Sequence, residues 1–224
     1  KNSETSQALI RDVVLLILME QCLTLMMRFW TACVCYAKVL NKTIPDEVLV
    51  AEVGQPLVTQ MRTLAPDEET AQKLLVVYRA RNEEDLDQKT KPFRVLRRLF
   101  EVLRKKDISQ RLLLQNASRL QRLLKSFGMY ELFARVNGME SSVGHKPDPD
   151  PLIQAAGDLE VSLERCIYIG EALFDIQAHM QLKIPCIGVT WGAFFSREVL
   201  AREKPTVLVE TMSELHDAIK QLTK

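Results

Sequence analysis

The chain has 224 residues, of which 47% are hydrophobic and 26% charged, a balance typical of folded globular proteins rather than disordered or fibrous ones. Lysine and arginine together number 30 against 29 acidic residues, which leaves a net charge of +1. Because no overall positive field is available to attract nucleic acid or an anionic membrane, we expect neither as a partner. The five cysteines lie in apolar stretches without the spacing of a disulfide framework or of paired metal knuckles, which indicates reduced thiols in a cytoplasmic protein.

The first predicted element is a strand over residues 13–19, VVLLILM. A short, uninterrupted apolar run is typical of a strand that is buried on both faces of a parallel sheet. Apolar positions stay dense over residues 23–40, a stretch too long for a strand, which predicts a helix that ends near Asn41. Glu20 and Gln21 interrupt this apolar region, which leaves fewer than the about 18 continuous residues that a membrane span needs, so we expect no membrane insertion.

Residues 46–88 contain only helical patterns, punctuated by Gly54 and Pro56, and predict a small all-helical module. Beyond this module, short apolar strands alternate with helices. The predicted strands cover residues 111–116, 166–171, 186–191 and 206–210, and the predicted helices cover 93–106, 117–127, 149–158 and 173–182. This alternation favours right-handed crossovers, and we therefore predict an α/β fold with a doubly wound parallel sheet. The core would comprise residues 1–22 and 90–224, with the all-helical module inserted over 23–89.

Ligands of open parallel sheets bind beyond the carboxyl ends of the strands, so the segments around those ends are the place to look for function. Three segments of interest are GHKPDPDPL at 144–152, CIYIGEALFDI at 166–176 and IPCIGVTWG at 184–192. Taken together, they resemble the phosphoglycolate phosphatase-like branch of the haloacid dehalogenase (HAD) superfamily, and the resemblance extends over almost the whole chain. It implies a HAD-like Rossmannoid core in which the helical module is a cap over the active site.

The resemblance implies a phosphate and metal site that is partly altered in this chain. In the family, the third motif supplies a lysine to the phosphoryl group, and Lys146 matches it. The fourth motif, GDxxxD, supplies carboxylates to Mg²⁺, and here Glu171 and Asp175 take those places. Glu171 is one methylene longer than the family's aspartate, and Mg²⁺ demands near-ideal octahedral geometry, so we expect only a weak, residual metal site. A second interpretation is that Asp175 simply caps the start of the following helix.

The family's second motif ends a strand with Ser or Thr, whose hydroxyl binds a phosphoryl oxygen. Gln115 stands at that position here, followed by Asn116. A side-chain amide can still donate to an anion, so we expect Gln115, Asn116 and Lys146 to form the phosphate- or anion-binding set. The alternative is that Gln115 and Asn116 cap the next helix together with Ser118.

The family's first motif, hhhhDxDGT, carries an aspartate that attacks phosphorus and, two residues later, an aspartate that acts as general acid and base. No DxD sequence occurs in this chain. One register places Leu18 and Glu20 in the two positions, and the other places Glu20 and Cys22 there; spacing alone leaves both open. Leucine can neither attack nor bind metal, and the second register pairs a longer glutamate with a cysteine. We therefore expect no catalytic residue at these degenerate positions.

The missing aspartates favour a catalytically inactive pseudophosphatase that acts as a protein-binding scaffold or regulatory subunit. The apolar helix over 23–40 would provide the surface for a protein partner or for self-association. No cofactor is expected, and Mg²⁺ only if residual phosphatase activity exists. Two alternatives stay open. One is a Mg²⁺-dependent phosphatase of a small phosphorylated metabolite such as phosphoglycolate, and the other is a sensor that binds an anion or metabolite through Lys146 and the remaining cleft.

Overall fold

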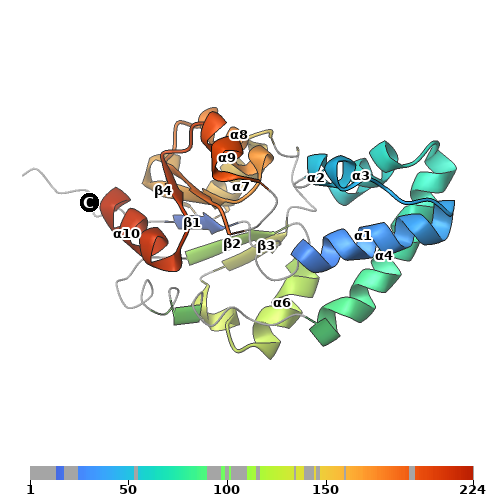
Figure 1. Ribbon diagram of the computed structural model, residues 1–224. Coiled ribbons are helices and arrows are strands. Elements are labelled where there is room, and N and C mark those ends of the chain that lie inside the picture. Colours follow the sequence, from blue (N-terminus) through green and yellow to red (C-terminus); the bar gives the residue numbers. More distant parts are fainter. Residues whose placement is uncertain are drawn as a thin grey trace, which may run out of the picture.

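The computed structural model of the protein describes residues 14–17, 25–52, 55–89, 97–98, 101, 110–114, 117–133, 135–138, 144, 147–158, 160–191 and 195–223. Figure 1 shows a layered α/β body with a group of helices to one side of it. The helices of that group, α1 to α4, come from the part of the chain that the sequence predicts to be all-helical. The predicted fold class is therefore confirmed, while the domain boundaries at residues 22/23 and 89/90 stay a prediction.

Six strands form one parallel sheet in the order β3-β2-β1-β4-β5-β6. Their bounds are β1 Val14–Ile17, β2 Gln110–Leu114, β3 Arg135–Gly138, β4 Cys166–Gly170, β5 Cys186–Val189 and β6 Val207–Val209. The chain starts in the middle at β1, moves outward to one edge through β2 and β3, and then returns to β4 and moves to the other edge. This is the doubly wound arrangement that the alternating pattern predicts.

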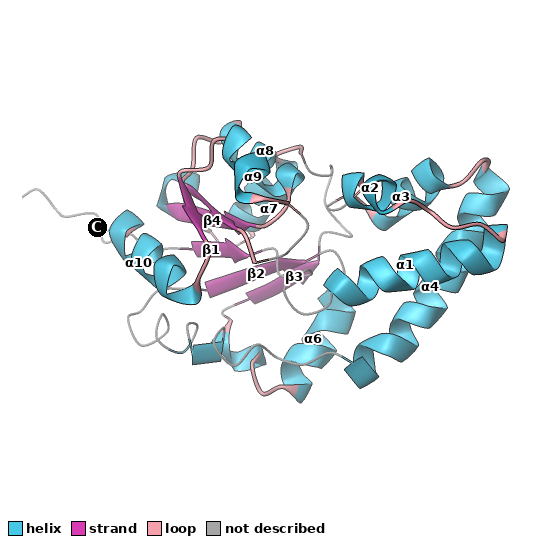
Figure 2. Ribbon diagram, in the orientation of Figure 1, coloured by secondary structure: helices cyan, strands magenta, loops and turns pink. Residues whose placement is uncertain are grey.

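Helices cover both faces of the sheet (Figure 2), and the side chains of β4 alternate between them. Ile167 and Ile169 pack into a buried cluster with α6 (Ala117–Ser126) and α10 (Met212–Leu222). Cys166 and Tyr168 pack into a second cluster with α7 (Asp150–Gly157), α8 (Leu173–Met180) and α9 (Arg197–Arg202). Because β4 is buried on both faces, its sequence CIYIG is continuously apolar or aromatic rather than alternating.

The group beside the sheet consists of α1 (Leu25–Leu40), α2 (Asp46–Ala51), α3 (Leu57–Leu64) and α4 (Glu68–Lys89), with α1 and α4 side by side (Figure 1). These helices have a core of their own, made by Cys35, Leu49, Met61, Leu64, Leu74, Leu75 and Tyr78. Asn41 follows α1 with a φ of 52°, in the left-handed region that asparagine tolerates at helix ends. Several side chains of α1 pack on this core, and a partner surface on the same helix stays a prediction.

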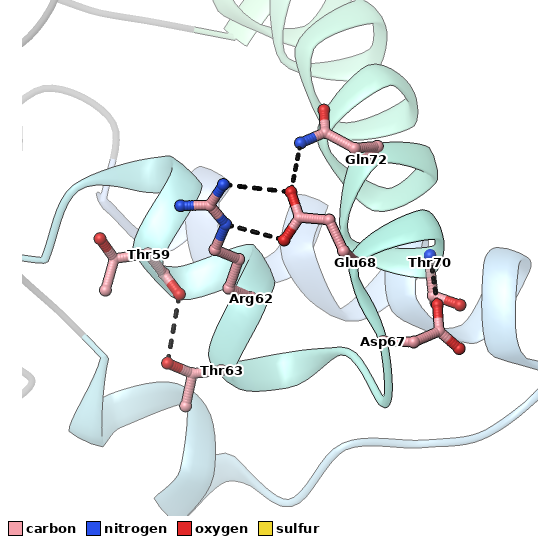
Figure 3. Close-up of polar contacts among 7 residues, drawn as sticks. All are labelled: Thr59, Arg62, Thr63, Asp67, Glu68, Thr70 and Gln72. Atoms are coloured by element: carbon pink, nitrogen blue, oxygen red, sulfur yellow. Dashed lines mark hydrogen bonds and ion pairs between the residues drawn. The ribbon is translucent and has the colours of Figure 1, made fainter.

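Polar side chains fix the turn between α3 and α4 (Figure 3). Arg62 forms a two-pronged contact with Glu68, with Nε 2.9 Å from Oε2 and Nη2 3.1 Å from Oε1. Gln72 donates to the same carboxylate, and Asp67 Oδ1 caps α4 by accepting from the backbone N–H of Thr70 at 2.7 Å. The Arg62 and Glu68 side chains are more than half exposed, so the pair orients the turn more than it stabilises the fold.

The predicted elements differ from the observed ones in several places. The strand β3 and the helices α9 and α10 were not predicted, and the predicted strand over 166–171 ends one residue earlier, at Gly170. It stops there because the backbone N–H of Glu171 donates to the side chain of Asp175 instead of a neighbouring strand. Most of the predicted basic helix over 93–106 lies outside the described residues.

Two further expectations concern the membrane and the thiols. In the part of the chain that the structure describes, no helix combines the length and apolarity that a membrane crossing requires. Cys33, Cys35, Cys166 and Cys186 are free thiols, and the latter three are buried. Cys166 and Cys186 belong to the apolar core beneath α7, α8 and α9, which fits a packing role.

Candidate active site

The strand order places the candidate site at the boundary between β1 and β4. The two strands are neighbours with Ile17 paired to Ile169, and the chain leaves them toward opposite edges of the sheet. In doubly wound sheets, ligands bind beyond the carboxyl ends of the strands at this reversal point. The segment that follows β1 in sequence carries the predicted first motif, and the segment that follows β4 carries Glu171.

Six of the predicted site residues lie outside the described residues. They are Leu18, Glu20 and Cys22 of the first motif and the anion-binding set Gln115, Asn116 and Lys146. Their roles stay predictions. The structure describes the other two, Glu171 and Asp175, and brings them together in one turn.

Glu171 and Ala172 form the turn that joins β4 to α8, and Asp175 reaches back over it from the first turn of that helix. Asp175 Oδ2 accepts from the backbone N–H of Glu171 at 3.2 Å and of Ala172 at 3.0 Å. Both carboxylates are buried, with Glu171 4% and Asp175 1% exposed. Asp175 therefore makes the capping contact expected of a carboxylate at a helix start, because these amides have no partner within the helix.

Tyr168 completes the support of Asp175 from beneath. Its hydroxyl donates to Asp175 Oδ1 at 3.2 Å, and its side chain is fully buried. Burial, together with the nearby carboxylate of Asp175, raises the pKa of Tyr168 well above its usual value, so the hydroxyl stays protonated and acts as the donor. Tyr168 is not among the predicted site residues, although a tyrosine inside an apolar strand is a sign that a buried hydroxyl needs a partner.

Gly170 is required where β4 meets the turn. A Cβ at this position would lie 2.4 Å from Cβ of Asp175, far closer than carbon atoms approach. Asp175 can lie over the end of the strand only because residue 170 has no side chain. The spacing from Gly170 to Asp175 therefore has a steric cause in this chain: the glycine makes room for the carboxylate that returns from the helix.

Glu171 and Asp175 fit Mg²⁺ in the type of their donor atoms. Carboxylate oxygens are the ligands this ion prefers, and it commonly binds one or two of them while keeping several waters. Asp175 accepts from three donors that hold it over the turn, and Glu171 directly follows the end of β4, where ligands of doubly wound sheets bind. By its position, Glu171 is therefore the carboxylate better suited to contact the ion. Across the described ranges, no group of three or more His, Cys, Asp or Glu side chains is arranged to hold a metal. The described part of the chain therefore supplies two carboxylates of a candidate metal site and not a complete set of protein ligands.

An open hollow of about 500 Å³ lies away from the β1–β4 boundary, at the edge of the sheet that β6 forms, between β6 and α10. Its acidic side chains already have structural partners. Glu210 pairs with Arg197 at 3.0 Å, and Glu214 accepts from the backbone N–H of Glu210 at 2.7 Å. The hollow contains none of the predicted site residues, so we do not assign the chemistry to it.

Comparison with known proteins identifies relatives that are named for phosphate chemistry. The chain matches the family described as haloacid dehalogenase-like hydrolase over residues 28–189, a range that begins after the predicted first motif. It is 28% identical to the pyrophosphatase PpaX of Listeria welshimeri over 182 residues, which cover 79% of this chain and 82% of that protein. It is 31% identical to a phosphoglycolate phosphatase of Salmonella typhi over 97 residues, covering 43% of this chain and 38% of that protein.

Solved structures share the fold at lower identity. A haloacid dehalogenase-like family hydrolase of Streptococcus pneumoniae superposes with a TM-score of 0.78 and 19% identity, covering 93% of this chain and 99% of that one. The β-phosphoglucomutase of Clostridium difficile superposes with a TM-score of 0.72 and 16% identity, covering 95% and 96%. The likeness extends over nearly the full length of both chains, so it includes the helices beside the sheet as well as the sheet itself.

The prediction of a catalytically inactive scaffold is wrong in the light of these relatives. They are named as phosphatases, which supports the alternative enzyme hypothesis over the inactive one. The loss of the DxD sequence is a fact of this chain, but by itself it does not outweigh relatives that are named as phosphatases. On the match over 28–189 and the doubly wound sheet, this chain belongs to the haloacid dehalogenase-like hydrolase family.

Proposed function

We propose that the protein is a Mg²⁺-dependent phosphatase that acts on a small phosphorylated substrate, with pyrophosphate and phosphoglycolate as the first candidates. The observation that carries this proposal is the buried turn of Glu171 and Asp175 at the reversal point of the sheet. Buried carboxylates that serve only stability are uncommon, because desolvation of the charge is costly. A metal ion next to Glu171 would compensate that cost and would supply positive charge for phosphoryl oxygens.

Pyrophosphate has the stronger support of the two candidate substrates. The match to the pyrophosphatase PpaX covers 79% of this chain, a share that the core without the helical cap could not supply. The match to the phosphoglycolate phosphatase covers only 43% of the chain. A relative whose likeness extends into the cap is the better guide to the substrate. A cap over the active site would surround the part of the substrate to which the phosphate is attached.

The roles of the remaining residues follow from their positions in the family's motifs. Lys146 would bind a phosphoryl oxygen through its charge, and Gln115 with Asn116 would donate to the same group. Glu20 stands in a catalytic position in both registers of the first motif, as acid and base in one and as nucleophile in the other. It is therefore the residue of that segment on which the proposed chemistry depends.

The test is the Mg²⁺-dependent release of phosphate from pyrophosphate and from phosphoglycolate. The wild type is compared with Glu171→Gln, which keeps the size of the side chain and removes its charge, and with Glu20→Gln. Glu164→Gln is the matched control, because Glu164 is exposed and precedes the amino end of the same strand β4. We expect turnover in the wild type and the control and its loss in the other two variants. Equal turnover in all four proteins would indicate a contaminating phosphatase, and no turnover in the wild type would refute the proposal.

A further inference from the structure

A polar chain of contacts runs from the apolar core to the turn that carries Glu171. It starts at Tyr168, in the middle of β4, whose ring lies in the core beneath α8. Its hydroxyl meets one oxygen of Asp175, and the other oxygen of Asp175 meets the backbone N–H groups of Glu171 and Ala172. Each of these contacts is between 3.0 and 3.2 Å long, and the side chains of the residues that make them are all buried.

The direction of this support decides which way the carboxylate of Asp175 faces. Tyr168 holds Oδ1 from the strand, and the two amides hold Oδ2 from the turn. A carboxylate has about four lone-pair sites, and these donors use at least three of them. Asp175 is 1% exposed, so its oxygens are turned toward the protein. It therefore acts on the turn, and Glu171, which directly follows the end of β4, stands where ligands of doubly wound sheets bind.

We propose that Tyr168 is a positioning residue for the active site: it fixes Asp175, and through Asp175 it fixes the backbone that presents Glu171. Where it concerns the metal, this inference rests on the proposed function. The hydrogen-bonded chain itself does not depend on any activity. A tyrosine that served only to fill the core would be replaced by phenylalanine without consequence for the turn, since the ring is retained.

The first experiment measures the turn without metal or substrate. Amide hydrogen exchange is compared in the wild type, Tyr168→Phe and Tyr78→Phe. Tyr78 is the matched control, because it is also buried but lies in the core of the cap. The loss of one hydrogen bond to a charged acceptor should speed exchange at the amides of Glu171 and Ala172 by about tenfold or more. Tyr78→Phe should leave those two amides unchanged, and unchanged exchange in Tyr168→Phe would overturn the proposal.

The second experiment links the turn to the metal. Phosphate release is titrated with Mg²⁺, and the shift in melting temperature that Mg²⁺ produces is measured beside it. Tyr168→Phe should raise the half-saturating Mg²⁺ concentration several-fold and keep most of kcat at saturating Mg²⁺, whereas Tyr78→Phe should change neither. An unchanged Mg²⁺ requirement in an active Tyr168→Phe enzyme would refute the positioning role. If the wild type neither turns over nor responds to Mg²⁺, the proposed function fails, and the exchange experiment still decides whether Tyr168 orders the turn.

Discussion

Replacement of Gly170 by alanine tests the geometry of the turn most directly. The new Cβ would lie 2.4 Å from Cβ, 3.2 Å from Cγ and 3.3 Å from Oδ2 of Asp175. Carbon atoms in contact are about 3.5–4.0 Å apart, so Asp175 has to move by roughly 1 Å. Its hydrogen bonds are already 3.0–3.2 Å long, and such a movement breaks or greatly weakens them.

The magnitude follows from the contacts that are lost. Overpacking of a core costs about 1–3 kcal/mol, and the loss of a hydrogen bond to a buried charged group costs about 1.5–3 kcal/mol. These costs overlap because the same movement causes both, and the smaller entropy of alanine in the unfolded chain returns about 0.4–1 kcal/mol. We therefore expect Gly170→Ala to lower the free energy of unfolding by about 2–4 kcal/mol.

The assay is urea-induced unfolding followed by circular dichroism and tryptophan fluorescence. Gly157→Ala is the control, because Gly157 is the last residue of α7 and a Cβ there would meet no atom within 4 Å. That variant should be as stable as the wild type or up to about 1 kcal/mol more stable. The steric reasoning about the turn would be refuted if Gly170→Ala unfolded at the same urea concentration as Gly157→Ala.

Three further predictions concern other parts of the molecule. Burial, only partly offset by the hydrogen bond to Ile184 O, lowers the pKa of His179 below that of an unfolded histidine. The stability that neutral His179 contributes is therefore present above about pH 6.5 and is lost as the pH falls below that value. In urea titrations, His179→Gln should lose less stability than the wild type between about pH 7.5 and 5.5. Lys183 has a φ of 55°, so Lys183→Gly should raise the free energy of unfolding by about 0.5–1 kcal/mol, and a destabilised variant would contradict this. Arg62→Ala should lower the melting temperature slightly at low salt and not at high salt, because the pair with Glu68 is exposed.

The fold could largely be predicted from the sequence, because the buried strands of a parallel sheet are apolar without interruption. The strands β1, β4, β5 and β6 each lie within a predicted strand, and β2 overlaps one but begins a residue earlier, at Gln110. The edge strand β3 has the sequence RVNG, in which no apolar run exists, so its pairing with β2 could not be foreseen. The helix α10 was missed although Thr211 and Glu214 have the spacing of a capping pair, and the hydroxyl of Thr211 does accept from the N–H of Glu214 at 3.2 Å.

The candidate site was predicted only in part. Glu171 and Asp175 were identified by their spacing, but spacing does not show that Asp175 turns back onto the backbone of the same turn. That contact depends on the absence of a side chain at Gly170 and on the hydroxyl of Tyr168, which belong to the strand rather than to the loop. The predicted inactive scaffold is wrong because it rested on the missing DxD sequence, whereas the likeness to phosphatases extends over most of the chain.

The strand β4 gives side chains to two separate cores and ends at the turn that carries Glu171. Attempts to make this protein more heat-resistant by repacking either core therefore act on the same strand that sets the site. A substitution chosen only for better packing beneath α8 would also change the strand that holds the turn with Glu171. Stabilising mutations are safer at exposed positions outside both cores, such as Lys183.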